Sequence, residues 1–156
     1  MRVLLLAPHP FYQQRGTPID VLLVLRVLAR RPDTKVDVVT YHEGEDVDLP
    51  DVRIFRTPYL PGLSDIRPGF SLKKVTCDVL LIGKALQLLR TYDYDLVHAG
   101  EEAVFPAMLF KRLFGVPFSY DIDSSIAQQL VEQKAYLEPF SELFDWMERQ
   151  AIRDSL

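Results

Sequence analysis

The sequence predicts an α/β domain with a Rossmann-like, mainly parallel sheet and helices on both faces. Short apolar segments alternate along the chain with helical patterns of a dozen or more residues. Helices of that length serve as the crossover connections between parallel strands. The 156 residues, 48% of them hydrophobic, are enough for one domain with a buried core.

The first elements are a strand, a helix and two further strands. Residues 3–7 form a continuous apolar run that ends at Pro8, which is typical of a strand buried on both faces. A helix follows over residues 18–30, with Thr17 as its N-cap and a proline at its first position. The next two strands are predicted at residues 35–41 and 52–57.

The second half of the chain continues the alternation. Ser71 predicts the N-cap of a long helix that runs to Arg90, and Gly115 predicts the end of a later helix over residues 101–114. The remaining elements are strands at residues 96–98 and 117–122, followed by helices that are interrupted near Pro139.

Composition narrows the classes of function. The net charge of −4 gives the whole molecule no attraction for nucleic acid, so no nucleic-acid partner is expected. The single cysteine, Cys77, excludes an internal disulfide and a cysteine-based zinc site, and no histidine or acidic residue has a metal-ligand spacing. The apolar run at the N-terminus is too short for a signal peptide, and no run is long enough to span a membrane, which predicts a cytoplasmic protein.

Ligands of parallel α/β sheets bind outside the carboxyl ends of the strands. We therefore expect the site among four segments, residues 8–17, 41–45, 98–102 and 121–125. The first segment lacks both Gly-x-Gly-x-x-Gly and the Walker lysine, so no dinucleotide or other cofactor is predicted.

Arg15, Gly16 and Thr17 lie at the N-terminus of the first predicted helix. Free backbone N–H groups and the helix dipole suit a phosphate or carboxylate there, Gly16 allows close approach to the backbone, and Arg15 offers a charged fork. In the alternative interpretation Gly16 makes the turn and Arg15 is solvated. Local chemistry leaves both open.

Two further strand ends carry polar candidates. His98 ends a strand, and a histidine there can act as an acid, a base or a ligand; alternatively, it is a half-buried side chain without such a role. Glu101 and Glu102 follow at the start of the next predicted helix, where the alternative is that they are first-turn acids that favour the helix dipole. Asp121 and Asp123 lie on the same side of the last strand and its loop, where two close carboxylates suit a general base or, alternatively, turn and capping roles.

Taken together, these segments resemble the N-terminal domain of the GT4-like family of GT-B glycosyltransferases. The likeness spans the chain, and the order and spacing of its motifs carry it. The stretches are residues 4–8 with the Arg15-Gly16-Thr17-Pro18 loop, residues 25–39, the Asp-hydrophobic-Val-His strand at 94–99, and the Gly-hydrophobic-Pro strand at 114–121; Glu148-Arg149-x-Ala151 resembles the helix before the second domain.

The resemblance implies that residues 1–156 are a single acceptor-binding domain and that a donor-binding domain is absent from this chain. A sugar acceptor is then its partner, and a nucleotide-sugar donor binds mainly through the missing domain. Gly16 and Thr17 match the family's loop near the donor phosphates and the acceptor. Asp123 stands where many members have a cleft-facing histidine. The resemblance therefore implies a catalytic role for Asp123, as a general base or an orienting group; the alternative is that the departure marks an altered activity.

Two interpretations stay open. In the first, the chain is the acceptor half of an enzyme and is inactive alone; in the second, it is a stand-alone binding or regulatory module without chemistry. Because many relatives act on lipid-linked acceptors, the resemblance also allows peripheral membrane contact, with Arg26, Arg30 and Arg31 or Lys73 and Lys74 as a surface patch. Solvated helix faces are the preferred interpretation of these basic residues.

Overall fold

The structure is a computed structural model, and it describes residues 1–14, 16–66, 71–122 and 141–156. Arg15, Asp123 and the predicted interruption near Pro139 lie outside these residues.

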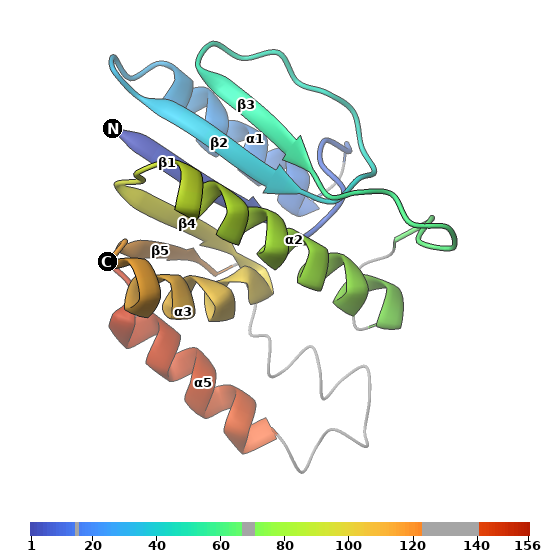
Figure 1. The fold of residues 1–156 in the computed structure, drawn as a ribbon, viewed down its shortest axis with the longest axis vertical. Helices are drawn as coiled ribbons and strands as arrows, with labels where there is room; N and C mark the ends of the chain where they lie inside the picture. The colour runs from blue at the N-terminus through green and yellow to red at the C-terminus, as the bar shows by residue number, and fades with distance from the viewer. Residues whose placement is uncertain (15, 67–70, 123–140) are drawn as a thin grey trace.

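Five strands form one parallel sheet, as predicted (Figure 1). The sheet has the order β3-β2-β1-β4-β5, and every neighbouring pair is parallel. The chain therefore extends the sheet first to one side of β1 and then, from β4 on, to the other side. The strands are β1 (Arg2–Ala7), β2 (Lys35–Thr40), β3 (Val52–Arg56), β4 (Leu96–Gly100) and β5 (Phe118–Asp121).

Helices cover both faces of the sheet, which confirms the predicted layers. Figure 1 shows α1 behind the sheet and α2 and α3 in front of it, with α5 beside α3. The bounds are α1 (Gly16–Ala29), α2 (Leu72–Thr91), α3 (Val104–Phe114) and α5 (Ser141–Asp154), and a short 3₁₀ turn, η1 (Glu101–Ala103), precedes α3. Each face has its own apolar core.

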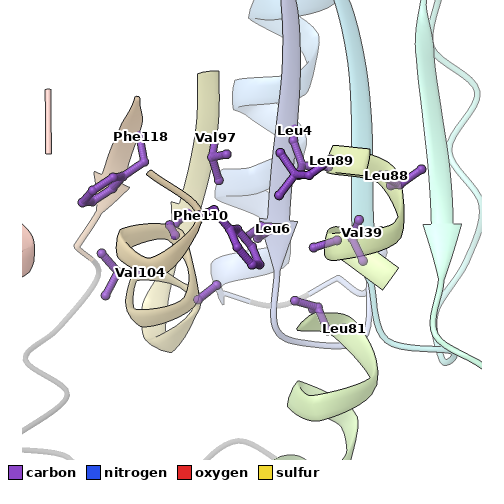
Figure 2. Packing of buried hydrophobic residues seen from close by; sticks show 14 of the residues in the cluster. Leu4, Leu6, Val39, Leu81, Leu88, Leu89, Val97, Val104, Phe110 and Phe118 are labelled. Atoms are coloured by element: carbon purple, nitrogen blue, oxygen red, sulfur yellow. The ribbon is translucent and has the colours of Figure 1, made fainter. Parts of the chain in front are cut away.

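The alternation of side chains along β1 divides these two cores. Leu4 and Leu6 face α2 and α3, and they are fully buried with Leu81 and Phe110 in the larger core (Figure 2). The intervening Leu5 packs with α1 on the other face. A central strand buried on both faces explains why its sequence is continuously apolar instead of alternating.

The helix ends follow the predicted capping residues. Ser71 Oγ accepts a hydrogen bond from the backbone N–H of Lys74 at 3.1 Å, and Gly115 ends α3 in the left-handed conformation at φ 70°. Two boundaries differ from the prediction. Helix α1 begins at Gly16, so Thr17 lies in its first turn instead of capping it, and Glu101 has φ 46°, which makes residues 101–103 a separate turn before α3.

A buried carboxylate ties the strands together near their amino ends. The side chain of Asp37 on β2 is only 1% exposed and accepts hydrogen bonds from Arg2 (2.9 Å), Arg53 (2.7 Å) and the Tyr94 hydroxyl (2.6 Å). Burial alone would raise the pKa of Asp37, but the hydrogen bonds from Arg53, Tyr94 and Arg2 outweigh it, and the pKa lies below its usual value.

Candidate functional site

The carboxyl ends of β1 and β4 lie side by side at the place where the sheet changes its direction of growth. In open α/β sheets this is the position of the ligand-binding crevice. Here Thr17 Oγ1, in the first turn of α1, donates a hydrogen bond to Glu101 Oε1 at 3.2 Å, across the two strand ends. The structure thus brings together two of the predicted site residues. At Gly16 a Cβ atom would meet nothing within 4 Å, so the backbone there is open to approach.

Glu101 also reaches the helix on the other face of the sheet. Its Oε2 lies 3.6 Å from Lys74 Nζ, and the same ammonium group pairs closely with the carboxylate of Glu102. Burial opposes the charge of Lys74, but Glu102 and Glu101 outweigh it and raise its pKa. Lys74 therefore holds both glutamates at the sheet edge.

A second pair extends this group toward β2. The hydroxyl of Tyr41, just after β2, donates a hydrogen bond to Asp78 on α2. Burial, and next the negative charge of Glu102, raise the pKa of Asp78 to about 7, while the bond from Tyr41 opposes the shift. The Asp78 carboxyl group thus titrates near neutral pH. We call Thr17, Tyr41, Lys74, Asp78, Glu101 and Glu102 the carboxyl-edge cluster.

The chemistry of the carboxyl-edge cluster follows from its composition. It holds three carboxyl groups and one ammonium group, and the ammonium group is already paired. Carboxylates accept hydrogen bonds from hydroxyl groups, and a carboxyl group with a pKa near 7 serves as an acid or a base. The cluster is therefore suited to bind a hydroxyl-bearing ligand and to exchange a proton with it.

His98 and Asp121 form a separate pair on the α1 side of the sheet. Val97 and Ala99 face the larger core, so the intervening His98 points to the opposite face, where its Nδ1 lies 2.9 Å from Ser119 Oγ and its Nε2 lies 3.7 Å from Asp121 Oδ2. Burial lowers the pKa of His98, although Asp121 opposes the shift, so the ring is neutral at pH 7. Its Nε2 makes no hydrogen bond with the described residues.

Arg56, the last residue of β3, fixes two loops of this edge. Its guanidinium donates to the backbone carbonyls of Phe11 (2.7 Å), Glu43 (2.9 Å) and Glu45 (2.9 Å), and to the carboxylate of Asp46 (2.8 Å). One side chain thus satisfies carbonyl groups of the loop after β1 and of the loop after β2. The ligand edge is held by side-chain hydrogen bonds at a place where no helix follows β2.

The predicted strand ends do meet at one edge of the sheet, but the sequence did not identify several of the residues that make contacts there. Tyr41, Asp78 and Arg56 were not predicted, and the expected solvation of Lys74 is wrong, since its side chain is only 13% exposed. One signal was available: Lys74 and Asp78 lie at the spacing of the buried stripe of α2 that continues through Cys77 and Leu81. The expected roles of Arg15 and Asp123 fall on residues outside the described ranges.

Other kinds of site have less support within the described residues. No group of three or more potential metal-ligating side chains is found there. No described helix has the length and apolar character needed to cross a membrane. Two surface pockets, of about 390 and 450 Å³, lie at the amino ends of the strands, away from the carboxyl-edge cluster.

The fold and the position of this edge define a class: the chain has the Rossmann-like fold of one half of a GT-B glycosyltransferase. Sucrose-phosphate synthase from Thermosynechococcus elongatus superimposes with a TM-score of 0.71 over 99% of this chain, at 15% identity. A UGT transferase from Siraitia grosvenorii, solved in complex with UDP, matches 91% of the chain with a TM-score of 0.52 at 16% identity.

The chain spans 40% of the length of the sucrose-phosphate synthase chain and 32% of the UGT chain. No protein-family model matches the sequence, and no curated protein matches it either. At these identities the likeness establishes the fold alone.

Proposed function

We propose that this chain is the acceptor-binding domain of a glycosyltransferase that transfers a sugar from a nucleotide-sugar donor. The observation that supports the proposal is the hydrogen bond between Thr17 and Glu101, which joins the first turn of α1 to a carboxylate at the switch point of the sheet. That is the position at which open α/β sheets bind their ligands. A carboxylate there is suited to accept hydrogen bonds from acceptor hydroxyl groups. The UDP in the Siraitia grosvenorii enzyme supports a nucleotide-activated donor.

The proposed division of roles follows from the contacts at the edge. Glu101 and Glu102 accept hydrogen bonds from acceptor hydroxyl groups, and Lys74 holds the two carboxylates in place. The open backbone at Gly16 admits the ligand close to α1. His98 and Asp121 lie on the α1 side of the same edge. Asp123, two positions further along the sequence, is the proposed general base or orienting group. Donor phosphates are bound mainly by a second domain.

The test is a transfer assay on the complete gene product. UDP-, GDP- and ADP-sugars are incubated with a panel of free sugars, polyols and lipid-linked acceptors, and nucleotide release and product mass are measured. We expect turnover with at least one pair. Asp123→Ala should lower it about a hundredfold or more, the usual effect of removing a general base.

Asp93→Ala provides the matched control, because this exposed aspartate lies at the opposite edge of the sheet. It should leave turnover unchanged. Near-normal transfer by Asp123→Ala would remove Asp123 from catalysis. Binding of an acceptor without transfer from any donor would contradict the enzyme and favour the non-catalytic binding module.

A further inference from the structure

A carboxylate of the protein lies against the first turn of α1. The first N–H groups of a helix lack partners within the helix, and together with the helix dipole they attract negative charge. In α1, which has 14 residues, Thr17 of the first turn donates its hydroxyl hydrogen bond to Glu101 Oε1. The Glu101 carboxylate therefore contacts the first turn of α1 through the Thr17 hydroxyl, and its negative charge lies beside the N-terminal end of the helix.

Two side-chain contacts and a constrained backbone hold Glu101 in this position. Oε1 accepts the bond from Thr17, and Oε2 lies 3.6 Å from the ammonium group of Lys74. Its backbone is in the left-handed region at φ 46°, which a glutamate adopts only where the surroundings fix it. Both carboxylate oxygens are therefore engaged by residues from helices on opposite faces of the sheet.

The surrounding charges disfavour a second anion. The Lys74 ammonium group pairs with Glu102 as well as with Glu101, so two carboxylates already share its positive charge. Two like charges within a few ångströms repel each other, and they repel more strongly near a protein surface than in bulk water. A phosphate at α1 would meet this repulsion from Glu101 and receive no free ammonium group from Lys74 in return.

We propose that Glu101 is a specificity-determining residue that excludes phosphorylated and other anionic acceptors and selects hydroxyl-rich acceptors without negative charge. The inference rests on the proposed acceptor-binding function. It replaces the expectation that the start of α1 binds phosphate. The negative charge of the donor diphosphate must then be neutralised by groups outside the carboxyl-edge cluster. Glu101 then contributes both a hydrogen-bond acceptor for sugar hydroxyls and a barrier to anions.

The experiment measures the binding of inorganic phosphate and of neutral sugars to the full chain by titration calorimetry and ligand-observed NMR. Glu101→Gln removes the charge and keeps the shape, so phosphate affinity should rise about tenfold or more at low salt, and the gain should shrink at high salt. Glu101→Asn should change affinity in the same direction, because asparagine tolerates a positive φ. Neutral sugars should gain nothing.

Glu142→Gln, an exposed glutamate on α5, is the control and should leave phosphate binding unchanged. Circular dichroism and melting curves establish that each variant is folded. Equal phosphate affinity in the wild type and both Glu101 variants overturns the inference, and the proposed function survives if transfer is still observed. If phosphate affinity rises in the Glu101 variants but neither the wild type nor any variant binds sugars or transfers them, the exclusion of anions by Glu101 is supported and the proposed function is refuted.

Discussion

Asp37→Asn should destabilise the fold strongly, because it removes the charge from a buried carboxylate that two arginines share. Breaking a buried ion pair costs about 3–5 kcal/mol when the remaining charge is left unpaired. Here the partners are partly hydrated, with the side chain of Arg2 24% exposed and that of Arg53 48% exposed. We therefore expect a loss of about 2–3 kcal/mol at pH 7, which lowers Tm by about 4–12 °C for a domain of this size.

The assay is thermal and urea unfolding followed by circular dichroism, with Asp46→Asn as the matched control. Asp46 also pairs with an arginine, at 2.8 Å, but its side chain is 88% exposed. Exposed pairs contribute little, so this control should shift Tm by no more than about 2 °C. Equal Tm values for Asp37→Asn and Asp46→Asn would refute the reasoning.

The pH dependence provides a second check on Asp37. Its folded pKa lies below the unfolded value, so its charge stabilises the fold above the unfolded pKa, and this stability is lost as the pH falls through the folded pKa. The gap between the wild type and Asp37→Asn should therefore be widest above about pH 5 and should narrow below about pH 4. A gap that stays constant down to pH 3 contradicts the assignment.

Two further predictions concern the carboxyl edge and its loops. Gly44→Ala should destabilise the chain by about 2 kcal/mol or more, because Gly44 has φ 116° and a Cβ there would lie 2.3 Å from the Phe11 carbonyl oxygen. Gly83→Ala is the control: no atom lies within 4 Å of a Cβ at this position in α2, so the change should stabilise the chain by about 0.5–1 kcal/mol. Urea unfolding of both variants measures the difference. Asp78 has a folded pKa raised to about 7, so its contribution to stability falls as the pH rises from about 4 to 7. Asp78→Asn should gain up to about 3 kcal/mol relative to the wild type between pH 4.5 and pH 8, and parallel stability curves over that range would contradict the shifted pKa.

Local sequence signals were sufficient for the fold. The apolar run of β1 predicted a strand buried on both faces, and Ser71 and Gly115 marked helix ends that the structure confirms. These signals depend on residues that are close in sequence. The alternation of strands and helices then predicted parallel pairing, and parallel pairing predicted the edge at which polar residues gather.

The contacts within the site were less predictable, because they join residues that are far apart in sequence. Thr17 and Glu101 are 84 residues apart, and Tyr41 and Asp78 are 37 apart. Glu102 could either interact with a helix dipole or pair with a lysine, and the outcome depends on where α2 packs. No sequence pattern around Glu102 specifies the position of α2. Lys74 is the instructive case: its place on the apolar stripe of α2 contradicted a solvated role, and that conflict marks a partner within the fold.

Arg56 has a consequence for loop transplantation. Its guanidinium binds carbonyl groups of the loop after β1 and of the loop after β2 at once, so the two loops share one structural support. A loop grafted from a relative keeps its shape only if it presents a carbonyl to the same guanidinium, and a poor fit would loosen the other loop as well. Engineers who wish to change what this edge accepts should therefore exchange residues 8–14 and 41–46 together and retain Arg56.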